Sequence, residues 1–183
     1  VAGLSAWKIL SPTSKEQPAD KQTAFPAARP VAAPVSAASA RVGVGLSVPY
    51  FDRNGQTWEA DRYFSGGTVR ARHSERIVRT LDPDLYRRPR IGDFRYDIPL
   101  APGNYELHLH FAETGLSDFI SAESSGEGQR VFRVSANGKV LLDYFDVVAD
   151  AAGTNTADER VFRNVSPDTD GYLRLAFAPL RGT

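Results

Sequence analysis

A strict alternation of apolar and polar residues constrains the fold more than any other feature of this sequence. In residues 105–111 the apolar side chains Leu107, Leu109 and Phe111 recur at every second position, the spacing of a strand with one buried face. Residues 130–136 and 172–177 are also β-rich, and Asn137-Gly138 marks a tight hairpin between 130–136 and 139–144. No amphipathic helix of useful length separates these runs. Many short strands with close turns predict an all-β antiparallel sandwich.

The composition changes near residue 40 and divides the chain into two regions. Residues 1–40 contain eleven Ala and five of the twelve Pro but only six charged residues, a composition typical of an extended spacer. Residues 41–183 hold the strand patterns. Because 183 residues leave no room for two full domains, we predict an Ala/Pro-rich arm or linker over 1–40 and one β-domain over 41–183.

The overall composition excludes several classes of function. The 22 basic and 22 acidic residues give a net charge of zero, which makes general nucleic-acid binding unfavourable. The chain has no Cys, so thiolate chemistry, disulfides and Cys-zinc sites are absent. No apolar stretch reaches the roughly 20 residues of a membrane span. Residues 1–10 are apolar but too short for one, and we interpret them as the stub of a removed anchor or signal, or as an arm that docks on protein.

Candidate metal ligands have an ordinary structural alternative in each case. Glu106, His108 and His110 share one face of a strand, a spacing that can chelate a metal or simply form a solvated face. The oxygen ligands of Asp143, Asp146 and Asp150 are weak calcium candidates, although their spacing matches no calcium-loop pattern. We therefore predict no metal and no cofactor.

Arginine is concentrated between residues 62 and 95, where nine Arg side chains occur. Guanidinium groups bind phosphate or sulfated sugars in a bidentate manner, but the interspersed acids favour a salt-bridged sheet face instead. The sequence has no Gly-x-Ser-x-Gly elbow and no dinucleotide loop, and nothing fixes a catalytic pair of carboxylates. We predict that the protein is not an enzyme.

An ordered series of short motifs resembles the malectin and malectin-like domains. The motifs are GQTWEAD (55–61), DPDLY (82–86), Arg90, FRYDIPL (94–100), LHFAE (109–113), GQRVFRV (128–134), Asn137-Gly138, DYFD (143–146) and DGYL (170–173). The resemblance covers about residues 41–183. It implies a jelly-roll-like sandwich, a non-catalytic carbohydrate-binding role and a location outside the cytoplasm, either secreted, at the cell surface or periplasmic.

The resemblance also shows where the sugar-contacting rings of malectin are missing. Gly115, Leu116 and Ile91 stand at three positions that are aromatic in malectin. Most other aromatic residues have strand or motif positions and are expected in the core: Trp58, Tyr86, Phe94, Tyr96, Tyr105, Phe111, Phe132 and Phe177. A different sugar-binding set is therefore expected on the rim: Tyr50, Phe51, Tyr86, Arg90 and Phe119.

Family members also continue into a closing strand beyond the position of Thr183, which predicts an open sheet edge here. The apolar residues of the arm are candidates to fill such an edge in a neighbouring subunit: Val1, Leu4, Trp7, Ile9 and Leu10. The main hypothesis is thus a carbohydrate-binding module. The alternatives are a self-associating structural subunit of an extracellular assembly or filament and a sensor ectodomain. The expected partners are a glycan and this chain itself or another protein, with a membrane only through a removed anchor.

Overall fold

The computed structural model describes residues 2–11, 39–72, 76–114 and 126–181 of this chain. The strands are β1 (Ala2–Leu10), β2 (Ala40–Gly43), β3 (Tyr50–Phe51), β4 (Thr57–Trp58), β5 (Phe64–Val69), β6 (Arg90–Pro99), β7 (Tyr105–Glu113), β8 (Val131–Ala136), β9 (Lys139–Phe145), β10 (Asp158–Val165) and β11 (Tyr172–Arg181). The helical elements are the short 3-10 turn η1 (Pro83–Leu85) and α1 (Val147–Ala151). Within the described ranges, no helix is long and apolar enough to cross a membrane.

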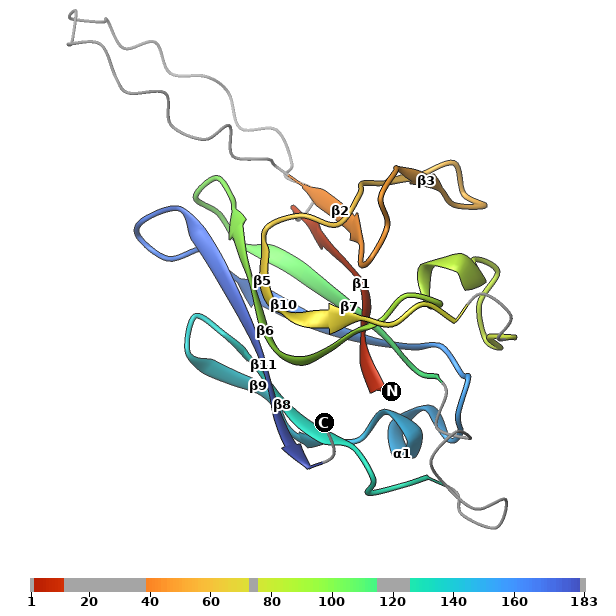
Figure 1. Cartoon of the computed structure of the whole chain (residues 1–183). Coiled ribbons are helices and arrows are strands. Elements are labelled where there is room, and N and C mark those ends of the chain that lie inside the picture. The colour runs from red at the N-terminus through yellow and green to blue at the C-terminus, as the bar shows by residue number, and fades with distance from the viewer. Residues whose placement is uncertain (1, 12–38, 73–75, 115–125, 182–183) are drawn as a thin grey trace, which may run out of the picture.

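Nine strands form one sheet in the order β10-β7-β1-β6-β11-β8-β9, with β2 added beside β1 and β5 beside β6. The named strands all pair in an antiparallel manner. The junction between β1 and β6 rests on a single residue pair, Leu4 and Arg90. The strands on either side of this junction form the two layers visible in Figure 1, which confirms the predicted all-β sandwich.

The main core lies between the two layers and follows the alternation seen in the sequence. Leu107, Leu109 and Phe111 of β7 are completely buried, as are Leu173 and Leu175 of β11. Each such side chain contributes roughly 1.5–3 kcal/mol by leaving water. All eight aromatic residues expected in the core are buried, so that prediction is confirmed.

The predicted hairpin between β8 and β9 is also confirmed. Asn137 and Gly138 occupy its turn with φ values of 46° and 77°, and Ala136 pairs with Lys139 on either side. Two positive φ values are what a two-residue turn of right-handed twist needs, and Asn-Gly supplies them at little cost.

Strand β1 comes from the region that the sequence analysis assigned to the arm. It pairs with β7 from Ala2 to Leu10 and with β2 from Ala6 to Ile9. Leu4, Trp7 and Ile9 are completely buried in the main core. These residues therefore supply a central strand of this chain's own sheet.

Candidate ligand-binding site

A small second core covers the outer side of the layer that contains β1 and β7. Loop and hairpin residues between 46 and 86 pack here on residues of β1, β7 and the turn before β10. The buried members are Ala6, Leu46, Trp58, Ile77, Leu85, Tyr86, Ala112 and Ala157. Tyr50 is half-buried against them, so the β3–β4 hairpin has its inner side fixed and its outer side in solvent.

Two aspartates hold the β3–β4 hairpin in place. The Asp52 side chain accepts hydrogen bonds from the backbone N–H groups of Asn54 and Gln56, at 2.9 and 2.8 Å, and from Trp58 Nε1 at 3.0 Å. Although partial burial acts in the opposite direction, these bonds lower the pKa of Asp52. The turn is consequently closed by a carboxylate that stays ionised.

Asp82, which precedes η1, ties the hairpin to the neighbouring loop. Its Oδ1 accepts from Tyr50 Oη at 2.9 Å and from the backbone N–H of Arg53 at 3.0 Å, while Arg53 Nε donates to the carbonyl of Leu81 at 3.0 Å. Burial and the Asp82 carboxylate together raise the pKa of Tyr50 to about 12. These contacts hold residues 50–53, which include Phe51, against the loop at Leu81 and Asp82.

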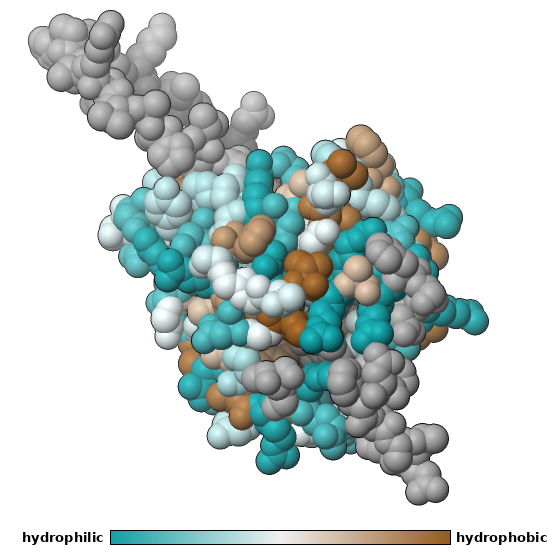
Figure 2. All heavy atoms as spheres, in the orientation of Figure 1, coloured by the Kyte–Doolittle hydropathy of each residue, from teal (hydrophilic) through white to brown (hydrophobic). Residues whose placement is uncertain are grey.

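The resulting surface, here called the rim patch, consists of Phe51, Arg53, Leu81 and Asp82. Phe51 and Leu81 are 70% and 73% exposed, unusually high values for large apolar side chains. Figure 2 shows hydrophobic atoms exposed among hydrophilic ones in the area where β3 lies in Figure 1. An exposed ring on a hairpin that also carries a guanidinium group and is bonded to a carboxylate can bind a ligand that has both apolar faces and hydroxyl groups.

The structure brings together only part of the predicted sugar-binding set. Tyr50 and Phe51 lie on the hairpin, and Phe119 lies outside the described residues. Tyr86 is 7% exposed and lies beneath Tyr50 in the small core, where its hydroxyl is 3.1 Å from His110 Nδ1. Burial raises its pKa further above the usual range.

Arg90 is buried away from solvent and has a structural set of contacts. Its Nη2 donates to Asp61 at 2.7 Å and its Nη1 to the carbonyl of Gly66 at 3.0 Å. Asp61 also accepts from Tyr96 Oη at 2.8 Å, and the guanidinium lies 3.6 Å from the ring centre of Phe64. Both charged side chains are only 5% exposed, so this pair holds the sandwich together rather than facing a ligand.

The two histidines of β7 are buried instead of forming a solvated strand face, and His110 contacts Trp58 and Tyr86 of the second core. His108 lies between carboxylates, with Nδ1 2.6 Å from Glu159 and Nε2 2.8 Å from Glu106. His110 lies edge-on to Trp58, and burial lowers its pKa to about 4. Lys8 of β1 completes the cluster at 3.3 Å from Glu159. Among the described residues, no group of three or more His, Asp and Glu is placed to hold a metal.

The three calcium candidates have separate partners. Asp143 binds Arg133 at 2.8 Å, Asp146 caps the start of α1, and Asp150 binds Arg160 at 2.9 Å. Several clustered arginines are likewise paired, since Arg62, Arg87, Arg90 and Arg95 have carboxylate partners. The salt-bridged interpretation fits these four.

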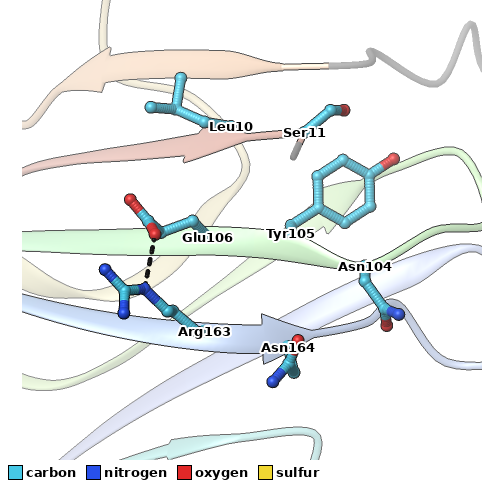
Figure 3. A pocket seen from close by; sticks show the side chains of 7 residues that line it. All are labelled: Leu10, Ser11, Asn104, Tyr105, Glu106, Arg163 and Asn164. Carbon is cyan, nitrogen blue, oxygen red and sulfur yellow. Dashed lines mark hydrogen bonds and ion pairs between the residues drawn. The ribbon is translucent and has the colours of Figure 1, made fainter. Parts of the chain in front are cut away.

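A partly open hollow of about 310 Å³ lies where β1 ends and β7 begins. Figure 3 shows its floor, where Arg163 and Glu106 form an ion pair at 3.0 Å beside Leu10 of β1. Tyr105 donates its hydroxyl to the carbonyl of Ala101 at 2.7 Å and stays buried. This hollow has no exposed aromatic ring, unlike the rim patch.

Arg53, Leu81 and Asp82 were missed as site residues by sequence reasoning. The pairs Tyr50-Phe51 and Thr57-Trp58, separated by a turn containing Asn54-Gly55, carried a usable hairpin signal. No local pattern, however, indicated that residue 82 would lie against residues 50 and 53.

The comparisons with known proteins agree with the β-sandwich fold. The Malectin domain model matches residues 43–168, so this chain belongs to the malectin domain family. A curated relative, the kinesin-like protein KIN-14R of Arabidopsis thaliana, is 34% identical over 125 residues; the match covers 67% of this chain but 11% of that protein.

Three solved structures share the fold. A Bacteroides uniformis beta-glucuronidase has a TM-score of 0.60 at 23% identity, with 77% of this chain and 16% of that chain covered. The ANX1 ectodomain from Arabidopsis thaliana has a TM-score of 0.58 at 16% identity, covering 77% and 44%. A structure of plant peptide RALF23 in complex with FER and LLG2 gives 0.55 at 22% identity, covering 68% and 38%. At these identities the likeness concerns the fold alone.

Proposed function

We propose that this malectin domain is a non-catalytic binding module that takes a glycan at the rim patch. The observation that carries the proposal is the Phe51 ring, which is 70% exposed although both of its chain neighbours are fixed by hydrogen bonds. A ring on a fixed backbone segment loses only side-chain freedom when a ligand stacks on it. The C–H face of a sugar ring is a suitable partner for such an aromatic surface.

The polar members of the rim patch suit the hydroxyl groups of a sugar. Asp82 has further acceptor capacity on its second oxygen, and Arg53 keeps guanidinium donors beyond the one bound to Leu81. Ile91, at a position that is aromatic in malectin, lies half-buried in β6. Phe51 therefore replaces the family's usual rings as the stacking surface in this proposal.

The same proposal includes a location outside the cytoplasm. It is supported by the structural likeness to the ANX1 ectodomain, which places a related fold on the outer side of a cell. The presence of a similar segment in a kinesin-like protein means that the fold alone does not set the compartment. A protease-accessibility assay on the full chain in its native cell would test the location.

The experiment for glycan binding compares Phe51→Ala with Tyr144→Ala. Tyr144 of β9 is 73% exposed but lies outside the rim patch, so it controls for the loss of any exposed aromatic residue. A neutral-oligosaccharide array would identify a ligand, and calorimetry would measure its affinity. We expect Phe51→Ala to weaken binding about tenfold or more, or ~1.4 kcal/mol, and Tyr144→Ala to leave it unchanged. No binding to the array, or equal effects of the two changes, would contradict the proposal.

A further inference from the structure

Strand β1 is held unevenly in the sheet, and this carries an inference independent of the glycan site. It forms eight residue pairs with β7 and four with β2 but only one with β6, and its register shifts between Leu4 and Ala6. Its side chains are nevertheless central to the core, since Leu4, Trp7 and Ile9 are completely buried. Removing β1 would therefore open an apolar slot with β7 on one side and β2 and the start of β6 on the other.

Two polar side-chain atoms of β1 find no hydrogen-bond partner among the described residues around this slot. Ser5 Oγ and Trp7 Nε1 are buried and have no hydrogen-bond partner within the described part of the chain. A buried polar group without a partner destabilises the packed state. The apolar contacts of β1 are thus partly offset by two unmet polar groups, so release of β1 is less unfavourable than for a fully satisfied strand.

The connection from β1 to the rest of the domain is long. Residues 11–39 lie between the end of β1 at Leu10 and the start of β2 at Ala40, a separation of 29 residues. A chain of that length spans up to about 95 Å when extended, several times the roughly 16 Å radius of gyration of a domain this size. The Malectin match begins at residue 43, so β1 also lies outside the segment that defines the family.

We propose that β1 exchanges between copies of this chain, so that the β1 of one copy occupies the slot between β7 and the β2 and β6 strands of a second copy. The contacts of β1 are the same within one chain and between two chains, and exchange therefore needs no new interface. The ratio of exchanged to unexchanged chains depends on the chain concentration relative to the effective concentration that the 29-residue connection provides. The exchange joins copies into dimers or longer assemblies through their cores.

Thiol crosslinking of the full chain tests this proposal directly, because the natural sequence has no Cys. Leu10 of β1 pairs with Glu106 of β7, and both are partly exposed on neighbouring strands (Figure 3). A Leu10→Cys chain is mixed with a separate Glu106→Cys chain at high concentration, incubated, and treated with a short bis-maleimide. The matched control replaces Glu106→Cys by Val140→Cys, which is 46% exposed on β9 and remote from β1.

Exchange predicts a crosslinked heterodimer whose yield is several-fold above the control and increases with concentration and incubation time. The double variant Leu10→Cys/Glu106→Cys, kept dilute, should crosslink within one chain and so verify the strand register. Heterodimer at the control level, with the double variant crosslinked, would overturn the proposal. Failure of the double variant to crosslink would overturn it too, since the proposed slot requires Leu10 beside Glu106.

Discussion

Replacing Trp7 tests whether β1 is an integral part of the core. The side chain is completely buried and lies edge-on to Tyr96, with 5.8 Å between ring centres. Truncating a buried Trp to Ala costs about 3–5 kcal/mol. The indole N–H has no partner among the described residues, and its removal returns about 1 kcal/mol or more. We expect Trp7→Ala to lower the free energy of unfolding by about 2–4 kcal/mol.

The assay is urea unfolding of dilute protein followed by far-ultraviolet circular dichroism. With an m-value of about 2 kcal/mol per molar urea, this loss lowers the midpoint by about 1–2 M. Trp7→Phe keeps most of the apolar surface and removes the unmet donor, so its stability should stay within about 1 kcal/mol of the unmodified chain. A midpoint for Trp7→Ala within about 0.3 M of the unmodified chain would refute the burial of β1 in this core.

Three further predictions concern buried charges and pH. Asp61→Ala should reduce stability by about 3–5 kcal/mol, because it leaves the buried guanidinium of Arg90 without its carboxylate. Glu59→Ala breaks an exposed ion pair and should cost less than about 1 kcal/mol. Urea midpoints of both variants check this. Burial and nearby Asp150 raise the pKa of Asp158 to about 6. The stability that this group contributes below about pH 4 is therefore lost as pH rises through 6. Asp158→Asn should stabilise the fold at pH 8 but not at pH 4. Burial lowers the pKa of His110 to about 4, so stability is lost as pH falls from about 6.5 towards 4. His110→Gln should flatten the dependence of the unfolding midpoint on pH between about 6.5 and 4. An unchanged slope would contradict the assignment to His110.

The strands that the sequence predicted correctly are those in which apolar and polar residues alternate. Leu107, Leu109 and Phe111 point to the main core at every second position, and a period of two is readable without any tertiary information. Strand β1 shows no such period, because Leu4, Ser5 and Ala6 are all completely buried although they are consecutive. In the sequence, a strand that is covered on both faces and interrupted by a register shift is a short apolar run whose type of secondary structure has no periodic signal.

The candidate site was predicted only in part for a similar reason. The exposure of Phe51 followed from its turn-rich neighbourhood, but the burial of Tyr86 against Tyr50 depends on residues more than 30 positions apart. His108 and His110 looked solvent-facing, because the loops that cover the outer side of β7 come from a distant part of the sequence. Local patterns describe one strand and its two faces, whereas what covers each face is decided by the tertiary fold.

The small second core separates the residues that would bind a ligand from those that position them. Trp58 and Tyr50 fix the hairpin from the inside, while Phe51 contacts mainly solvent. Phe51→Ala should therefore change glycan affinity and leave the free energy of unfolding within about 0.5 kcal/mol of that of the unmodified chain. Trp58→Ala should reduce both, because it removes buried surface and also the Nε1 bond to Asp52 that closes the turn. If the two variants instead lost affinity and stability in equal proportion, Phe51 would be a structural residue and the glycan site would have to lie elsewhere.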